Sequence, residues 1–263
     1  MNRTVKRVVT ALTSASIVTG ALLTLDKFAS RTISFNVILA AMIILVSLVQ
    51  LEFYQMIARR FAVMTLPGVL TGVVYLAGRF FFQVPNIIVP LFFMIALTAL
   101  FGKYERPLEA FAHTALGFFY IPWLLGGFIE IPHLHGIMIM LYVIAIIKIS
   151  DMGGYALGVA MGKHKMCPSI SPNKSWEGMA GSILASVIVS CLFVPLTGYA
   201  LSKAIAFGVA AAVLGTLGDL VESKIKRDCG VKDSATFMPA GLGGFLDMFD
   251  SLIFAPALLL PFL

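Results

Sequence analysis

Charged residues are scarce in this chain. Only 12% of its 263 residues are Asp, Glu, Lys or Arg, about half of the roughly 25% that is typical of soluble domains. Hydrophobic residues make up 59% of the sequence, and the mean hydropathy is +0.96. This composition excludes an ordinary soluble domain and predicts an integral membrane protein.

Cysteine is also scarce. The three cysteines, Cys167, Cys191 and Cys229, are far apart and form no Cys-x-x-Cys pair. A disulfide framework or a zinc site would need more cysteines at characteristic spacings. The sequence therefore predicts that these thiols are packing residues.

Long hydrophobic runs are abundant. A membrane-spanning helix needs about 20 mostly apolar residues. Eight segments qualify and a ninth is marginal: 8–25, 34–54, 61–78, 84–102, 109–129, 135–150, 179–199, 203–217 and the marginal 245–263. We expect the first to be a retained helix and not a signal peptide, because no convincing cleavage site follows it.

The predicted fold is thus an all-α polytopic membrane protein with eight or nine transmembrane helices. No repeat of solenoid period and no long linker interrupts it. We divide it into an N-terminal transmembrane bundle, residues 1–145, and a catalytic membrane region, residues 146–263, which carries both long polar stretches.

The distribution of Lys and Arg predicts the orientation. With the N-terminus inside, 15 of the 19 basic residues fall on cytoplasmic segments. Cytoplasmic loops carry such an excess, so the polar stretches 151–178 and 218–244 are expected to face the cytoplasm. The net charge of +6 reflects this asymmetry and is weak evidence for an anionic partner.

The second polar stretch holds the densest charge. Residues 218–234, GDLVESKIKRDCGVKDS, contain eight charged residues in seventeen. If the preceding helix continues past Leu217, four polar side chains share one of its faces: Asp219, Ser223, Lys226 and Arg227. Asp247 and Asp250 follow, three residues apart. Carboxylates at membrane depth are candidates for function, although Asp219 with Lys226, or Asp247 with Lys232, could simply be structural charge pairs.

The first polar stretch combines glycines with lysines. Pro172 and Asn173 favour a turn, and Ser175 before an apolar run favours a helix start. A solvated loop with topological lysines is the alternative interpretation. Carboxylates suit Mg²⁺, which takes one or two of them together with substrate phosphates. Together the two stretches predict a site for a nucleoside triphosphate.

These motifs closely resemble those of the phosphatidate cytidylyltransferases, or CDP-diacylglycerol synthases. That family has a Ser-x-x-Lys-Arg segment, a Lys-Asp pair, a Gly-Gly turn and two aspartates three apart. An upstream Ser-Pro-x-Lys-Thr/Ser-x-Glu-Gly element resembles SPNKSWEG here. The matching positions are Ser171, Pro172, Lys174, Ser175, Glu177, Gly178, Ser223, Lys226, Arg227, Lys232, Asp233, Gly243, Gly244, Asp247 and Asp250.

The resemblance covers residues 145–263 and implies a reaction of CTP with phosphatidate that gives CDP-diacylglycerol and pyrophosphate. It implies a catalytic group of Ser223, Lys226, Arg227, Lys232 and Asp233. Substrate contacts would come from Ser171, Lys174, Ser175, Glu177, Gly243 and Gly244. Mg²⁺, with a second cation left open, would be held by Asp219, Asp247 and Asp250.

The resemblance further implies a homodimer in the inner membrane of a bacterium, with the active site facing the cytoplasm and no nucleic-acid partner. Two positions depart from the family pattern. Leu242 stands where a His commonly precedes the Gly-Gly, and Met248 stands where an Arg commonly follows the first Asp. A CTP-dependent lipid-alcohol kinase of the polyprenol type and a transporter remain alternatives.

Overall fold

A computed structural model describes residues 31–81, 86–234 and 244–263 of the chain. The predicted helix at 8–25 and the predicted site residue Gly243 lie outside the described residues, as does Leu242.

The N-terminal half is a series of helices connected by short loops. They are α2 (Arg31–Ile57), α3 (Thr65–Phe80), α4 (Ile88–Phe101), α5 (Pro107–Phe118), the π-helix η1 (Phe119–Trp123) and α6 (Gly127–His135). From α5 to α6 the chain forms a single apolar span, residues 107–135.

The C-terminal half adds a small hairpin to the helices. Its elements are α7 (Ile137–Met161), β1 (Lys165–Cys167), β2 (Ser171–Ser175), α8 (Trp176–Leu192), α9 (Val194–Thr197), α10 (Leu201–Asp228), α11 (Phe245–Phe249), the 3-10 turn η2 (Asp250–Leu252), α12 (Ala255–Leu259) and the 3-10 turn η3 (Leu260–Phe262). The two strands pair antiparallel.

Helices dominate the described chain, as the composition predicted. Within the described ranges, five segments are long and apolar enough to cross a membrane: 36–57, 107–135, 137–161, 201–228 and 245–262. The helices 88–101 and 176–192 are apolar but shorter. The protein is therefore a helical membrane protein, while the count of eight or nine spans and the orientation of the N-terminus remain predictions.

Several predicted boundaries differ from those observed. Helix α7 continues to Met161, eleven residues beyond the predicted end at 150, because its glycines face a neighbouring helix instead of opening a loop. The turn predicted at Pro172 and Asn173 lies in strand β2. The chain reverses earlier, where Ile170 N–H donates to the Cys167 carbonyl at 3.1 Å.

Small residues bring α7, α8 and α10 into close contact. A Cβ on Gly181 of α8 would lie 2.6 Å from the carbonyl oxygen of Gly153 on α7. On α10, a Cβ on Gly208 would lie 2.6 Å from the Cα of Val187 on α8. Such close backbone approach is typical of helix packing in membranes, where small residues let the backbones come close enough for extensive van der Waals contact. These contacts fix the three helices that carry most of the polar side chains.

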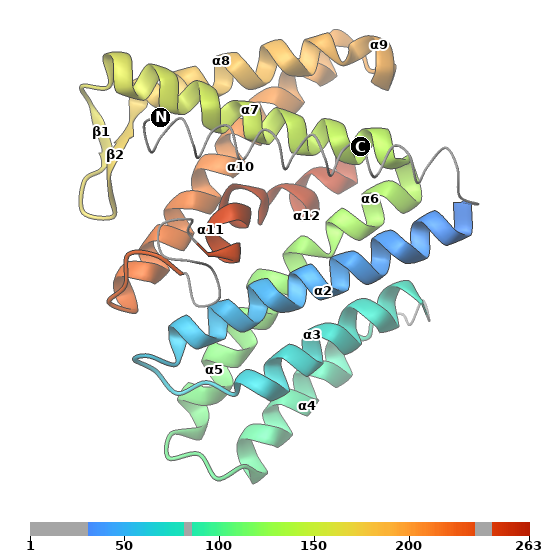
Figure 1. Cartoon of the computed structure of the whole chain (residues 1–263), viewed down its shortest axis with the longest axis vertical. Coiled ribbons are helices and arrows are strands. Elements are labelled where there is room, and N and C mark those ends of the chain that lie inside the picture. Colours follow the sequence, from blue (N-terminus) through green and yellow to red (C-terminus); the bar gives the residue numbers. More distant parts are fainter. Residues whose placement is uncertain (1–30, 82–85, 235–243) are drawn as a thin grey trace, which may run out of the picture.

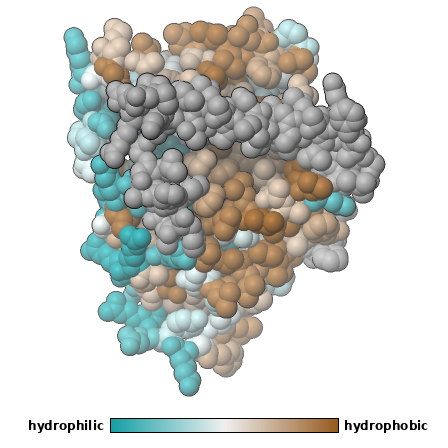
Figure 2. All heavy atoms as spheres, in the orientation of Figure 1, coloured by the Kyte–Doolittle hydropathy of each residue, from teal (hydrophilic) through white to brown (hydrophobic). Residues whose placement is uncertain are grey.

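The polar connections gather on one side of the molecule. Figure 1 shows the β1–β2 hairpin, the C-terminal end of α10, the α2–α3 connection and the α4–α5 connection at the left of the view. In the same orientation, most of the hydrophilic surface lies along that edge, and the rest of the visible face is largely apolar (Figure 2). This arrangement matches a protein whose charged loops emerge from one face of a membrane.

The C-terminal elements pack against the N-terminal helices. Helix α11 contacts α2, and α12 contacts both α6 and α10, so they lie in the middle of the fold (Figure 1). The predicted division between residues 145 and 146 falls inside the continuous helix α7. The two parts share one hydrophobic core. The division into an N-terminal bundle and a catalytic region therefore stays a prediction about function.

Candidate functional site

Helix α10 continues without a break from Leu201 to Asp228, as the charge pattern predicted. Asp219, Ser223 and Lys226 are at least partly buried, whereas Arg227 is exposed and donates to the Val231 carbonyl at 3.1 Å. The predicted polar face therefore exists, but its last member points to solvent.

A glycine brings α10 against the C-terminal segment. Gly218 lies so close to the backbone of Asp250 that no side chain would fit between them. As a result, Asp219 and Asp250 lie near each other, and their carboxyl groups interact electrostatically. Two carboxylates at this separation repel each other unless a proton or a cation neutralises them. We refer to Asp219 and Asp250 as the acid pair.

Lys226 connects α10 to α11 through two carboxylates. Its ammonium lies 2.5 Å from Glu222 Oε2 and 2.7 Å from Asp247 Oδ1. Glu222 is 1% exposed, so this ion triad is deeply buried. The sequence anticipated charge pairs here but with other partners, because it could not show which helix face meets which.

Asp247 also holds the start of α11. Its Oδ2 accepts from Gly244 N–H at 2.7 Å and from Ser234 N–H at 3.3 Å. A carboxylate in this place satisfies backbone donors that a helix start leaves open. Asp247 is thus engaged by Lys226 and by the backbone, whereas Asp250 faces Asp219.

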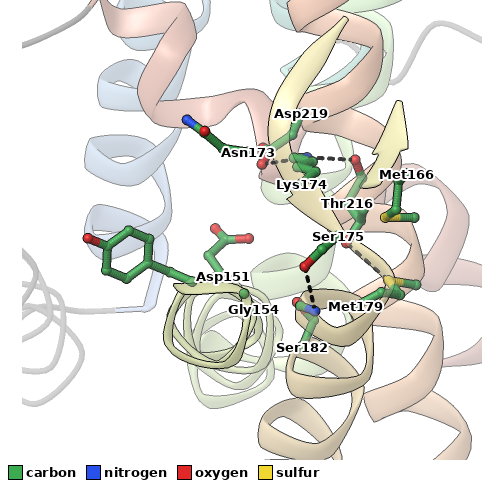
Figure 3. A pocket seen from close by; sticks show the side chains of 13 residues that line it. Asp151, Gly154, Met166, Asn173, Lys174, Ser175, Met179, Ser182, Thr216 and Asp219 are labelled. Atoms are coloured by element: carbon green, nitrogen blue, oxygen red, sulfur yellow. Dashed lines mark hydrogen bonds and ion pairs between the residues drawn. The ribbon is translucent and has the colours of Figure 1, made fainter. Parts of the chain in front are cut away.

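A lysine of the β1–β2 hairpin, Lys174, forms an ion pair with one member of the acid pair. Lys174 Nζ lies 2.9 Å from Asp219 Oδ2 and donates to the Thr216 carbonyl at 3.0 Å, as Figure 3 shows. The next residue, Ser175, begins α8, and its hydroxyl accepts from Gly178 N–H at 3.1 Å. The helix start predicted at Ser175 is confirmed.

A cavity of about 210 Å³ lies beside these groups. It is lined from four directions: by α7, by the hairpin, by the start of α8 and by α10 (Figure 3). Its polar lining comes from Asp151, Tyr155, Asn173, Lys174, Ser175, Ser182, Thr216 and Asp219. Carboxylates and an ammonium at its wall make it suitable for a ligand that carries phosphates and a cation.

Glu177 lies at the outer end of this region. Its carboxylate accepts from its own backbone N–H and from the His164 ring, whose Nδ1 is 2.6 Å from Oε1. These hydrogen bonds, the backbone one foremost, lower the pKa of Glu177 to about 2. Glu177 therefore connects the start of α8 to His164, the residue before β1. It does not line the cavity.

Other predicted residues lie further out or have only a backbone role. Ser171 begins β2 and is partly buried, while Lys232 and Asp233 are exposed beyond the end of α10. Gly244 precedes α11, where a Cβ would collide with Glu52. Of the implied catalytic group, the structure places Ser223 and Lys226 on the buried side of α10.

The sequence did not single out a second polar cluster on α7. Lys148 Nζ donates to the Met248 carbonyl and to Ser251 Oγ, both at 3.0 Å, and lies 3.7 Å from Asp151 Oδ2. Ser251 Oγ in turn donates to Asp151 Oδ2 at 2.8 Å. In the sequence, Lys148 contributes only to the excess of basic residues on the predicted cytoplasmic side. No motif therefore indicated this contact.

Two further residues come from the N-terminal half. Glu52 of α2 is fully buried, and its Oε2 accepts from Leu246 N–H at 2.8 Å. Tyr120 of η1 is 5% exposed, and its ring packs against Phe53 and Phe254. The site therefore draws on helices that no motif identified.

The acid pair fits a divalent metal ion better than the predicted set of three does. Within the described residues, no three His, Cys, Asp or Glu side chains are arranged to hold a metal. Mg²⁺ needs only one or two carboxylates when substrate phosphates and waters complete its octahedron. Asp219 and Asp250 have this chemistry, whereas Asp247 is already bound to Lys226.

Comparisons with known proteins identify the family of this chain. The sequence model of the cytidylyltransferase family matches residues 5–263. Proteins named phosphatidate cytidylyltransferase are 40% identical over 124 residues in Haemophilus influenzae, 44% over 126 in Staphylococcus aureus strain COL and 46% over 107 in Mycobacterium bovis.

These alignments cover 45%, 47% and 40% of this chain. They span 43%, 48% and 34% of the relatives, so less than half of each relative is matched. The family match, in contrast, extends over nearly the whole sequence. The chain belongs to the cytidylyltransferase family.

Proposed function

We propose that this protein is a phosphatidate cytidylyltransferase, which converts CTP and phosphatidate to CDP-diacylglycerol and pyrophosphate. The observation that carries the proposal is the acid pair, which lies beside a polar cavity and is bridged on one side by Lys174. Family membership and the relatives' names support the same activity.

The chemistry requires positioning and neutralisation of charge. An ionised oxygen of the phosphatidate phosphate attacks the α-phosphorus of CTP, a new P–O bond forms, and the bond to the β-phosphate oxygen breaks to release pyrophosphate. The attacking oxygen is already ionised near neutral pH, so no general base is needed. Fixed cations lower the barrier most when they are already in place before charge develops.

The lysines of the site are suited to this task. Lys174 pairs with Asp219, and Lys226 pairs with Asp247, so each ammonium is held at a defined position. When phosphates enter the cavity, Lys174 can exchange its carboxylate for a phosphate oxygen. Lys148, near the backbone of Met248, supplies a further cation where the family pattern commonly has an arginine.

Asp219 and Asp250 would hold Mg²⁺, which supplies positive charge against the triphosphate when it is bound. The predicted role of Asp247 as a third ligand requires Lys226 to release its carboxylate. A second cation remains part of the proposal. Ser223, partly buried one turn beyond Asp219, is placed to contact either a cation or a phosphate.

The membrane setting suits a substrate pair of this kind. CTP is soluble, and the acyl chains of phosphatidate stay in the bilayer, so the reacting phosphates must meet at the membrane surface. We propose that the polar face of Figure 2 is cytoplasmic, in the inner membrane of a bacterium, and that the protein works as a homodimer. The Lys and Arg distribution supports the orientation.

The test is product analysis with detergent-purified protein, CTP, phosphatidate and Mg²⁺. CDP-diacylglycerol and pyrophosphate should appear in equal amounts, and the Asp250→Asn variant should form neither. CDP without pyrophosphate, together with a phosphorylated lipid alcohol, would identify a kinase instead. Binding of CTP without any product from either lipid class would contradict the proposal.

A further inference from the structure

The hairpin that holds Lys174 at the wall of the cavity is short. Strand β1 has three residues and β2 has five, and the pairing runs from Lys165 opposite Ser175 to Cys167 opposite Ser171. A two-stranded hairpin of this kind is at best marginally stable without support from the rest of a fold. The position of Lys174 therefore depends on what holds the base of the hairpin.

The base of the hairpin is held by His164 and Glu177. Trp176 N–H donates to the His164 carbonyl at 2.9 Å. The Glu177 carboxylate accepts from the His164 backbone N–H, at 3.2 Å to each oxygen, and its Oε1 is 2.6 Å from His164 Nδ1. His164 precedes β1, and Glu177 lies in the first turn of α8. These contacts join the two ends of the hairpin, and we refer to His164 and Glu177 as the clasp.

The carboxylate of Glu177 is engaged by the clasp and not by the cavity. It also accepts from its own backbone N–H, and it does not line the cavity. A carboxylate would in addition repel the phosphates of a nucleotide, because both groups are negative. The contacts of Glu177 therefore favour a role other than the substrate contact that the motif resemblance implied.

The clasp lies three residues from the side chain that does reach the cavity. Lys174 Nζ is 2.9 Å from Asp219 Oδ2 and 3.0 Å from the Thr216 carbonyl oxygen, and the side chain is 22% exposed. Figure 3 shows Lys174 directed from β2 toward these two groups of α10. Because the clasp fixes the backbone directly after β2, it also sets the direction in which the Lys174 side chain leaves the strand.

We propose that the clasp positions Lys174, so that Glu177 is a positioning residue that acts through the hairpin and not on the substrate. When a nucleoside triphosphate enters the cavity, Lys174 exchanges Asp219 for a phosphate oxygen, and the clasp keeps its ammonium within reach. Without the clasp, the hairpin has to be ordered during binding, which lowers affinity. This inference rests on the proposed function in assuming that CTP binds in this cavity.

The experiment is a double-mutant cycle on the Kd for CTP, measured by isothermal titration calorimetry on the detergent-purified full chain with Mg²⁺. Lys174→Met should weaken binding about 10-fold or more, because a charged hydrogen bond to phosphate is lost. Glu177→Ala should weaken binding about 2- to 10-fold, the cost of ordering one long side chain. In the Lys174→Met background, Glu177→Ala should change the Kd by less than about twofold.

A second measurement follows the hairpin itself. Hydrogen–deuterium exchange of residues 163–175 should be faster in Glu177→Ala than in the native protein, with or without CTP, because the base of the hairpin is released. Glu177→Gln keeps an acceptor oxygen for the His164 N–H and should retain most of the affinity and of the protection.

The matched control is Glu109→Ala. Glu109 also lies in the first turn of its helix, and it accepts from the distant Ala62 N–H at 2.9 Å. This variant should lower the melting temperature, but it should leave both the Kd for CTP and exchange in the hairpin unchanged.

The outcomes separate the two proposals. If the effects of Glu177→Ala and Lys174→Met multiply in the double variant, Glu177 acts independently of Lys174 and the inference is overturned. Native affinity for CTP in Glu177→Ala, unchanged exchange in its hairpin, or absence of CTP binding to the native protein would also overturn it. The expected cycle, with no CDP-diacylglycerol from the native protein, would retain the clasp and reject the proposed reaction.

Discussion

Lys226 provides the sharpest test of the site, because it neutralises two acids at once. Its ammonium lies 2.5 Å from Glu222 and 2.7 Å from Asp247, and Glu222 is 1% exposed. Lys226→Met leaves both carboxylates without their cation. Breaking a buried ion pair from one side costs about 3–5 kcal/mol. For a chain of this size we expect a fall in melting temperature of roughly 6–20 °C.

The assay is thermal unfolding in detergent, followed by circular dichroism, together with turnover of CTP and phosphatidate. Lys224→Met is the matched control, since Lys224 lies on the same helix and forms an exposed pair with Asp228. Removing that pair should change stability by less than about 1 kcal/mol.

A second substitution separates stability from chemistry. In Lys226→Met/Glu222→Gln one uncompensated charge is removed, and Asp247 keeps its hydrogen bond from Gly244. The double variant should regain at least half of the lost melting temperature but none of the turnover. A single Lys226→Met variant that melts within about 2 °C of the native protein would refute the argument.

Three further predictions follow from single contacts. Asp250→Asn should abolish turnover without lowering the melting temperature, because it relieves repulsion with Asp219; a destabilised variant would argue against the acid pair. Glu52→Ala should destabilise the protein by about 1.5–3 kcal/mol and reduce kcat, because Leu246 N–H loses a charged acceptor. Gly181→Ala should lower stability by about 1–3 kcal/mol in thermal unfolding, because its Cβ would meet the α7 backbone at 2.6 Å.

Two controls accompany these variants. Glu52→Gln keeps an acceptor oxygen and should retain about half of the stabilisation, as expected when a charge-assisted hydrogen bond becomes a neutral one. Gly158→Ala on α7 places a Cβ 3.6 Å from Ser175 Oγ, an ordinary van der Waals contact, and the variant should melt no earlier than the native protein. Equal destabilisation by both glycine variants would contradict the packing argument.

Local sequence signals predicted local structure well. The continuation of α10 past Leu217 followed from charges spaced on one helical face, and the start of α8 at Ser175 followed from its capping chemistry. The sequence did not predict the extension of α7 to Met161. Its glycines favour a loop unless the helix that they pack against is known. Here their lack of a side chain serves interhelical contact.

The distant contributions to the site could not be predicted. Glu52 and Tyr120 stand alone in apolar runs, with no spacing that connects them to a motif. Their positions depend on α2 lying beside α11 and on the ring of Tyr120 packing against Phe254, an arrangement set by packing across the whole fold. The charge pairs were anticipated in kind, but the partners Lys174 with Asp219 and Lys226 with Asp247 depend on that same packing.

The contact between Glu52 and Leu246 also bears on how the protein is made. Its two residues are 194 positions apart, so α2 is synthesised and enters the bilayer long before its partner leaves the ribosome. The start of α11, and with it the orientation of Asp247 and Asp250, can become fixed only when that late segment docks on α2. An incompletely synthesised chain therefore cannot assemble the acid pair, which ties competence for chemistry to the completion of biogenesis.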